Sequence, residues 1–285
     1  MDQAGSLRKV AASGHAQHPP SGHGGKLRAL AVASGKGGVG KTNIVANLAY
    51  TLNAMGKRAL VFDADMGLGN VHILLGLTPK YNLEHVISGR KKMEDVVVKG
   101  PGGIEILPAG SGHRKYSELT GEEMLALKTE LEVLESRYDF ILFDIGAGIS
   151  SNVMYFCSAA SEVAVITSTE PTSFADAYAI MKVLSRDYDQ HDFKLVVNNV
   201  KNAFDAANIH NRLERVAERF ELNIRIDLLG HIPYDESVPK CVKEQRLFAE
   251  WYPNSPASQC VRKIAKKLTK APSPTGVGWS RVFAL

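Results

Sequence analysis

The chain has few cysteines, and none of them are paired. Its 285 residues include three, Cys157, Cys241 and Cys260, and no two of these form a C-x-x-C pair. This excludes a disulfide framework and the usual zinc and iron–sulfur motifs, and it is typical of a reducing cytoplasm. The sequence also lacks an apolar run near the ~18 residues that a membrane-spanning helix needs, and its beginning lacks the apolar core of a secretory signal. We therefore expect a cytoplasmic protein with one large domain and appendages.

Acidic residues are absent from the last part of the chain. Residues 253–285 carry six basic side chains and no acidic one, and residues 1–30 carry four basic against one acidic. The net charge of the chain is +4, so residues 31–252, with 24 basic and 29 acidic side chains, are net acidic. An acidic body argues against specific nucleic-acid binding by the domain surface. Basic ends suit an anionic partner, such as a membrane surface or nucleic acid.

The pattern of apolar and polar residues divides the chain into four parts. Residues 1–10 form a short polar–apolar segment, and residues 11–26 are rich in Gly, Ser, Pro and His, which predicts a flexible linker. Residues 27–252 alternate apolar runs with helical periodicity. Two prolines mark the end of that region, and residues 253–285 form a basic, amphipathic tail.

The alternation in the third part predicts its fold class. Strands are expected at 28–34, 58–63, 104–107, 139–144, 162–167, 193–199 and 226–231. Helices are expected at 41–55, 119–137, 150–158, 172–187, 205–220 and 237–247. Strands that are apolar almost throughout and alternate with helices are typical of a mostly parallel, twisted sheet with helices on both faces. We expect a single globular α/β domain.

A glycine-rich segment directly follows the first expected strand. Residues 35–42 match the phosphate-binding pattern G-x-x-x-x-G-K-[ST] and add a second lysine, Lys36. The glycines let several backbone N–H groups point at one anion, and the helix that follows adds the positive end of its dipole. Lys41 is expected to reach the β- and γ-phosphates, and the Thr42 hydroxyl to ligate Mg²⁺. The sequence thus predicts a P-loop NTPase whose loop contacts with the nucleotide come from Gly35, Lys36, Gly37, Gly38, Val39, Gly40, Lys41, Thr42 and Asn43.

Carboxylates end two of the expected strands. Asp144 follows an apolar strand, where a carboxylate is expected to hold Mg²⁺ directly or through water. Asp63 and Asp65 end another strand, and at this spacing they point the same way if the strand persists. We expect Asp65 to orient the attacking water, because phosphoryl transfer needs positioning and charge neutralisation more than covalent help. The expected metal ligands are Thr42, Asp63 and Asp144; the alternative is that these carboxylates only form turns or cap a helix.

With Lys36, Asp63, Asp65 and Asp144, the chain resembles the deviant-Walker-A ATPases of the MinD/ParA family, a SIMIBI type of P-loop NTPase. In that family the extra lysine, here Lys36, crosses to the phosphates of a partner subunit, so that ATP completes a dimer. The resemblance implies a slow, Mg²⁺-dependent ATPase in which Lys36 and Lys41 act with Asp65. Two facing triphosphates need cations from both chains, so ATP binding and dimerisation would favour each other.

Further segments resemble the flagellar-number regulators of the FlhG (FleN) type. They are residues 63–70, 74–79, 144–149, 170–178 and 232–238. Residues 2–8 resemble the N-terminal DQAxxLR activator of that family, which stimulates an FlhF-type GTPase, and Gln3 would reach towards the GTP site. The resemblance implies regulation of flagellar number or placement, with three kinds of partner: an FlhF-type GTPase, a flagellar C-ring protein and a flagellar transcription regulator.

The resemblance also implies where the base of ATP would lie. The family's adenine contact falls on Asn198, and Asn199 is close enough in register to remain a candidate. An amide presents both the donor and the acceptor that an adenine edge requires. Backbone around Pro233 is expected to line the other side of the base. Alternatively, either asparagine closes a turn after its strand.

Two segments of the tail are candidates for membrane contact. The first, near 257–270, has a narrow apolar stripe and five basic residues, and is alternatively a core-packed final helix. The second places Trp279, Val282 and Phe283 at helical spacing, which suits the headgroup boundary of an anionic membrane; the alternative is a disordered end. One such segment binds weakly, so we expect reversible attachment to the inner face of the cell membrane, strengthened by dimerisation.

Other functions remain open at this stage. The nearest alternative is a MinD-like division-site regulator, and residues 2–8 favour the flagellar role over it. A ParA-like partition ATPase is a further alternative, against which the acidic body argues. A metabolic or redox relative, such as an iron–sulfur carrier, is disfavoured because the chain has no paired cysteines.

Overall fold

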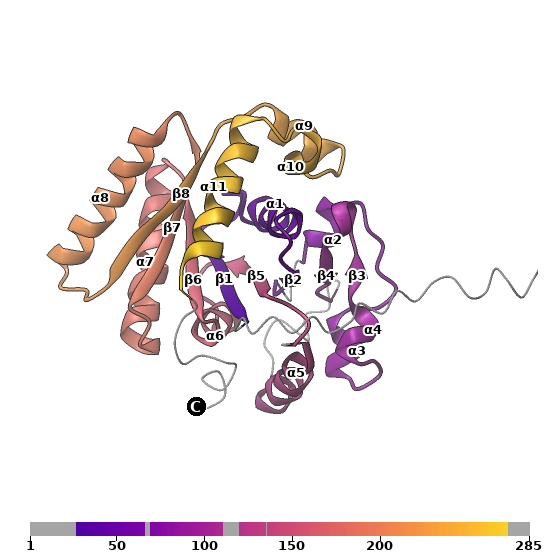
Figure 1. Cartoon of the computed structure of the whole chain (residues 1–285). Coiled ribbons are helices and arrows are strands. Elements are labelled where there is room, and N and C mark those ends of the chain that lie inside the picture. Colours follow the sequence, from indigo (N-terminus) through magenta and orange to yellow (C-terminus); the bar gives the residue numbers. More distant parts are fainter. Residues whose placement is uncertain (1–26, 66–68, 111–119, 135, 273–285) are drawn as a thin grey trace, which may run out of the picture.

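The computed structural model describes residues 27–65, 69–110, 120–134 and 136–272 (Figure 1). The expected activator segment with Gln3, the linker at 11–26, and the tail residues Trp279, Val282 and Phe283 lie outside these ranges. Within the described ranges, no helix has both the length and the apolar character needed to span a bilayer.

In the described part of the chain, eight strands form one sheet in the order β3-β4-β2-β5-β1-β6-β7-β8. Every neighbouring pair is parallel except β3 and β4. This confirms the mostly parallel sheet that the alternation predicts. The strands are β1 (Arg28–Ser34), β2 (Ala59–Asp63), β3 (Val98–Lys99), β4 (Glu105–Leu107), β5 (Phe140–Ala147), β6 (Glu162–Thr167), β7 (Asp192–Val200) and β8 (Arg225–Pro233).

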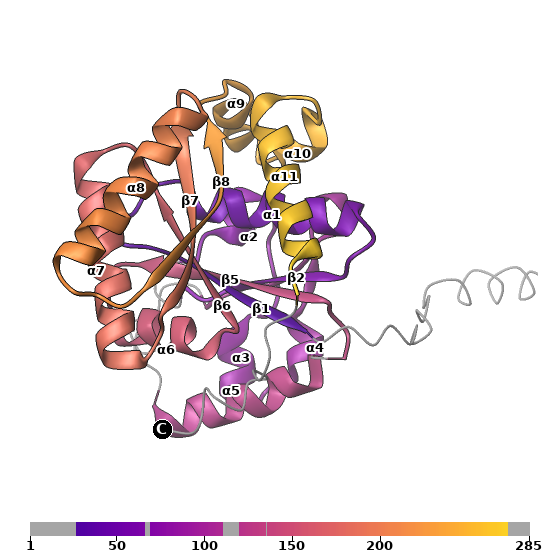
Figure 2. The same ribbon diagram turned by 60° about the vertical axis from the view of Figure 1, so that its left-hand side comes forward.

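Helices cover both faces of the sheet (Figures 1 and 2). One apolar layer lies between the sheet and α3 (Leu83–Ile87), α4 (Met93–Val96), α5 (Gly121–Leu134), α6 (Ser151–Ala159), α7 (Pro171–Tyr188) and α8 (Ala203–Arg219). The other lies between the sheet and α1 (Lys41–Ala54), α2 (Val71–Leu74), α9 (Ser237–Lys243), α10 (Phe248–Trp251) and α11 (Pro256–Lys270). Strand β1 explains the apolar runs in the sequence: Leu30 and Val32 face one layer and Ala31 and Ala33 the other, so all four positions are apolar.

Helix α11 is part of the packed domain. Val261, Ile264, Ala265 and Leu268 are buried in the layer that also contains α1, and α11 packs on both α1 and β8. The core-packed alternative for residues 257–270 is therefore correct, and the apolar stripe of this helix is not available to a membrane. The domain continues to Lys270, which corrects the sequence-based boundary at residue 252.

Two other regions differ from the sequence-based assignment. The helix expected at 237–247 ends early, at Lys243, as α9, because the chain turns at Gln245 with a left-handed φ of 54°. Helix α10 begins at Phe248, beyond the expected range, and was not predicted. Between β2 and β4 the chain forms the short elements α2, α3, α4 and β3 and the 3₁₀ turn η1 (Pro101–Gly103), none of which was predicted. Each is five residues or fewer, too short to display a helical or alternating period.

Arg28, the first residue of β1, is buried and joins three elements. Its guanidinium pairs with the Glu162 carboxylate at the start of β6, with Nη2 at 2.7 Å from Oε1 and Nε at 2.8 Å from Oε2. Its Nη1 donates to the backbone carbonyls of Leu268 and Ala271 at the C-terminal end of α11. A cation is favourable there because the last carbonyls of a helix carry partial negative charge. The first and last described segments therefore meet at the amino-terminal ends of the central strands β1 and β6.

Candidate nucleotide-binding site

The loop between β1 and α1 needs glycine at two positions for different reasons. Gly40 precedes α1 with a φ of 88°, in the left-handed region that favours glycine. Gly35 has an ordinary φ but lies against α7, where a Cβ would be 2.3 Å from the Asp176 carbonyl oxygen. The glycines thus let the loop turn sharply, as the sequence pattern predicts, and also let it approach α7 closely, which was not predicted.

Lys41 and Asp144, which are far apart in the sequence, are brought into contact. The Lys41 ammonium lies 2.5 Å from Asp144 Oδ1, and both side chains are buried. Lys41 is the first residue of α1, and Asp144 lies within β5, next to β1 in the sheet. The expected phosphate-binding lysine and the expected metal-holding carboxylate therefore neutralise each other in this structure.

Asp63 lies beside Asp144. The two are register partners on β2 and β5, and Asp63 is fully buried. Its carboxylate accepts hydrogen bonds from the backbone N–H groups of Val71 at 3.1 Å and Asp65 at 3.3 Å. Burial, and next the charge of Asp144, raise the pKa of Asp63 to about 8. Two carboxyl groups in one buried site need a cation, and Lys41 supplies only one charge.

Asp65 faces an open cavity of about 1140 Å³. Lys41, Thr42 and Asn43 at the start of α1 line the same cavity. Gly146, which also lines the cavity, lies beside Asp65: a Cβ there would be 3.4 Å from the Asp65 carboxyl carbon. The structure therefore brings together all the residues that were expected to act on the phosphates and the metal, apart from Lys36.

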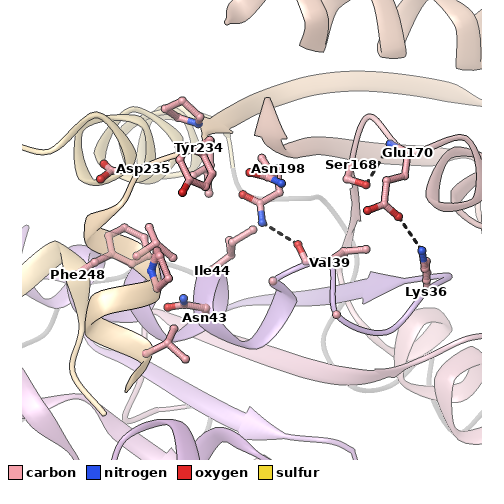
Figure 3. A pocket seen from close by; sticks show the side chains of 18 of the residues that line it. Lys36, Val39, Asn43, Ile44, Ser168, Glu170, Asn198, Tyr234, Asp235 and Phe248 are labelled. Atoms are coloured by element: carbon pink, nitrogen blue, oxygen red, sulfur yellow. Dashed lines mark hydrogen bonds and ion pairs between the residues drawn. The ribbon is translucent and has the colours of Figure 1, made fainter. Parts of the chain in front are cut away.

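A second pocket of about 500 Å³ lies beside the loop (Figure 3). Asn198 lines it, and its Nδ2 donates to the Val39 carbonyl in the loop at 2.7 Å. Asn199 lines it too but is exposed, with a left-handed φ of 57°. Pro233 also lines this pocket. The pocket is also lined by Asn43, Ile44, Tyr234, Asp235 and Phe248.

Lys36 points away from the carboxylate cluster. Its ammonium lies 2.7 Å from Glu170 Oε2 and 3.2 Å from the Thr172 hydroxyl, at the start of α7 (Figure 3). The side chains of Lys36 and Glu170 are 41% and 63% exposed, so this pair lies at the surface. Lys36 is thus accessible to another molecule.

Several residues that line the pocket of Asn198 were not predicted from the sequence, among them Tyr234 and Phe248. Tyr234 follows Pro233 directly, so the proline was a signal for it. Phe248 comes from α10, a helix that was not predicted separately, and no pattern in the sequence pointed to it.

The residues present fit a magnesium ion held together with phosphates. Among the described residues there is no group of three or more His, Cys, Asp or Glu side chains that could hold a metal alone. Asp63 and Asp144 form a buried carboxyl pair, and burial, followed by the charge of Asp144, raises the pKa of Asp63; a further cation would counter both effects. Thr42 lies in the adjoining cavity. Oxygen donors of this kind suit Mg²⁺ better than a softer metal.

A glycine-rich loop that runs from a parallel strand into a helix, with a lysine at its end and carboxylates on the neighbouring strands, defines the P-loop class of nucleotide-binding proteins. Residues 30–248 match the family described as the CobQ/CobB/MinD/ParA nucleotide binding domain. The antiactivator FleN of Pseudomonas aeruginosa is 41% identical over 248 residues, which cover 87% of this chain and 88% of FleN. The flagellum site-determining protein YlxH of Helicobacter pylori is 32% identical over 85% of this chain and 81% of YlxH. The chain therefore belongs to the MinD/ParA family and is of the FlhG/FleN type.

Solved structures agree with this fold. The chain matches a structure of the MinC:MinD cell division complex from Aquifex aeolicus with a TM-score of 0.69 and 26% identity, over 88% of this chain and 98% of that one. The cell division ATPase MinD of Pyrococcus furiosus has the same fold, with a TM-score of 0.70 and 23% identity over 85% and 98% of the two chains.

Proposed function

We propose that this chain is an ATP-dependent switch that regulates the number or placement of flagella. It binds ATP with Mg²⁺, dimerises in the ATP state and hydrolyses ATP slowly. The observation that carries the proposal is the placement of Lys36 and Lys41 on one loop. Lys41 is buried against the carboxylates, whereas Lys36 is exposed and directed away from them. The identity to FleN and YlxH supports the flagellar role.

The proposal gives each residue of the phosphate site a role. Backbone N–H groups of the loop hold the triphosphate, and Lys41 moves from Asp144 to the β- and γ-phosphates. Thr42, Asp63 and Asp144 hold Mg²⁺, which neutralises charge on those phosphates. Asp65, which faces the same cavity, orients the attacking water. The MinD of Pyrococcus horikoshii, which has the same fold, was solved with Mg-ADP.

The adenine base occupies the pocket between Asn198 and Pro233. Asn198 is favoured over Asn199 because its hydrogen bond to Val39 holds it against the loop, whereas Asn199 is exposed. One hydrogen of the Asn198 amide is used by Val39, and its oxygen remains to accept from an adenine amino group. Guanine presents an oxygen at that position, so adenine is preferred.

The dimer is tested by trapping it. In an Asp65→Ala variant, ATP should convert the monomer to a dimer in size-exclusion chromatography with light scattering, because hydrolysis is blocked. Adding Lys36→Gln should abolish the ATP-dependent dimer while leaving ATP binding within a few-fold of the parent. Lys266→Gln, on the exposed face of α11, is the matched control and should leave the dimer intact. An ATP dimer that survives Lys36→Gln would contradict the proposal.

The N-terminal segment, which lies outside the described residues, is proposed to act on a partner protein. We propose that residues 2–8 stimulate an FlhF-type GTPase and that Gln3 is the residue that does so. A peptide of residues 1–20 should accelerate GTP hydrolysis by such an enzyme, and the Gln3→Ala peptide should not. By the same reasoning, a flagellar C-ring protein and a flagellar transcription regulator are proposed partners; the name antiactivator for FleN supports the latter.

The chain is proposed to act in the cytoplasm and to attach reversibly to the inner face of the cell membrane through Trp279, Val282 and Phe283. Since α11 is packed into the domain, these residues outside the described ranges are the remaining candidate. Co-sedimentation with anionic liposomes should require ATP and should be lost when residues 273–285 are deleted. Co-sedimentation that is the same with and without ATP, and with and without residues 273–285, would contradict this role.

A division-site role is the second candidate. The septum site-determining protein MinD of Bacillus subtilis is 30% identical over 84% of this chain and 88% of that one. Loss of the gene distinguishes the two roles: a change in flagellar number with normal septa supports the flagellar role, and minicells support the division role.

A further inference from the structure

Asn47 is a fully buried asparagine on α1, one helical turn after Asn43. Its Oδ1 accepts a hydrogen bond from the backbone N–H of Ala249 on α10 at 2.9 Å. Its Nδ2 donates to the backbone carbonyl of Asn43 at 2.8 Å. A backbone N–H can only donate and a carbonyl can only accept, so these two contacts fix which end of the Asn47 amide is oxygen and which is nitrogen.

The orientation of Asn47 fixes that of Asn43 in turn. Asn47 Nδ2 also lies 2.7 Å from the side-chain Oδ1 of Asn43. Because Asn47 presents hydrogens at this contact, Asn43 must present its oxygen. The Asn43 NH₂ group therefore remains available as a donor on the side away from Asn47. The Ala249 N–H and the Asn43 carbonyl thus orient the Asn47 amide, and the Asn47 amide in turn orients the Asn43 amide.

Asn43 stands between the two halves of the proposed nucleotide site. It lines the cavity of Lys41 and Thr42, where phosphates would lie, and also the pocket of Asn198 and Tyr234, where the base would lie (Figure 3). The part of ATP that joins the base and ribose to the outer phosphates is the α-phosphate. An amide N–H is a good partner for its anionic oxygen.

We propose that Asn47 is a positioning residue that holds Asn43 as a hydrogen-bond donor to the α-phosphate of bound ATP or ADP. This inference rests on the proposed nucleotide-binding function. Phe248, the neighbour of Ala249 on α10, lines the base pocket, so one relay joins a wall of that pocket to the phosphate donor. Asn43 contacts the ligand, and Asn47 acts through Asn43.

The test uses the full chain and compares ADP with the two diastereomers of ADP that carry sulfur on the α-phosphate, by titration calorimetry with Mg²⁺. Sulfur accepts hydrogen bonds poorly, so the wild-type protein should bind one diastereomer about tenfold or more weakly than ADP. Asn43→Ala should bind ADP about tenfold more weakly and should lose that discrimination. Asn43→Ala leaves unchanged the lysines and carboxylates that are proposed to act on the outer phosphates.

Asn47→Asp tests the relay itself. A carboxylate keeps the acceptor for Ala249 but offers no donor to Asn43, so the Asn43 amide turns over and the discrimination should disappear. In the Asn43→Ala background the same change should cause no further loss of discrimination. Asn47→Ser also removes the amide donor and serves if Asn47→Asp does not fold.

Thr51→Val is the matched control. Thr51 is buried on the same helix, and its hydroxyl donates to the Asn47 backbone carbonyl at 2.7 Å, outside the relay. This change should lower thermal stability but leave ADP affinity and discrimination within twofold of wild type. Full discrimination in folded Asn47→Asp would overturn the role of Asn47, and none in the wild type would overturn the α-phosphate contact. A wild-type chain that binds no ADP would instead overturn the proposed nucleotide binding.

Discussion

At the scale of single residues, the proposed phosphate site contains more buried acid than base. Lys41 pairs with Asp144, and Asp63 lies next to Asp144 without a cation of its own in the described structure. The protonation of Asp63 therefore depends on what else enters the site. The pKa of Asp63, raised by burial and by Asp144, is the physical sign of this imbalance.

The first prediction concerns the pH dependence of stability. Between the ordinary pKa of 3.8 and the raised value of about 8, folded Asp63 holds a proton that the unfolded chain has released. The free energy of unfolding should therefore fall as the pH rises through this window, by at most ~1.4 kcal/mol per pH unit from this group. Asp63→Asn should remove that part of the slope. Urea unfolding between pH 5 and 8.5, with a chelator and no nucleotide, gives the free energy of unfolding of the wild type and of Asp63→Asn. The same slope of this free energy against pH in both proteins would contradict the prediction.

The second prediction separates two glycines of one loop. A Cβ on Gly35 would overlap the Asp176 carbonyl, whereas a Cβ on Gly37 has no atom within 4 Å. Gly35→Ala should lower the free energy of unfolding by ~1–3 kcal/mol, because loop or helix must shift. Gly37→Ala should stay within ~1 kcal/mol of wild type. Equal effects in urea unfolding would mean that the loop does not pack on α7 as described.

The positions of the carboxylates could be predicted from the sequence, but their partners could not. Asp63 ends β2, and Asp144 is its register partner on β5, which continues to Ala147 instead of ending at residue 144 as expected. Both lie toward the carboxyl ends of their strands, which parallel strands carry to the same side of a sheet. By contrast, Lys36 and Glu170 are 134 residues apart, and Asn47 and Ala249 are 202 apart. No local pattern encodes such pairs, because they depend on how α7 and α10 pack against the loop and α1.

At the scale of elements, the long buried strands and amphipathic helices were predictable, while the short helices between β2 and β4 were not. Helix α2 has four residues, about one turn, which is too few to show a period. Helix α11 was predictable as a helix, but its environment was not. An apolar stripe with lysines beside it suits a membrane surface and a domain surface equally, and only the contact with α1 and β8 distinguishes them.

The third prediction tests the packing of α11. Ile264 is buried in the layer shared with α1, and it approaches β8 so closely that a Cβ on Gly230 would lie 2.6 Å from its side chain. Ile264→Ala should lower the free energy of unfolding by ~2–5 kcal/mol. Lys266→Ala, on the opposite face of the helix, should change it by less than ~0.5 kcal/mol. A small cost for Ile264→Ala in urea unfolding would mean that α11 is peripheral.

At the scale of the whole molecule, the proposed dimer depends on freeing Lys36. In the single chain it is held by Glu170 at the start of α7, in an exposed pair. Exposed ion pairs contribute ~0.2–1 kcal/mol, so this contact opposes dimerisation only weakly. It nevertheless must break before Lys36 can reach the phosphates of a second copy.

The fourth prediction follows from that competition. In an Asp65→Ala background with ATP, Glu170→Gln should strengthen dimerisation by up to about fivefold per subunit, because Lys36 is released. Sedimentation velocity over a range of protein concentrations gives the dissociation constant. Glu236→Gln is the matched control, since it removes another exposed pair, with Lys240, and should have no effect. A larger dimer dissociation constant for Glu170→Gln would contradict the prediction, because it would show that Glu170 stabilises the dimer.

The position of Arg28 has a mechanical consequence. By joining the start of β1 to the end of α11, it makes the chain enter and leave the domain at one corner, at the far end of β1 from the glycine-rich loop. An attachment made through either flanking segment would therefore hold the domain at this one corner. The proposed nucleotide-binding loop, at the opposite end of β1, would stay uncovered.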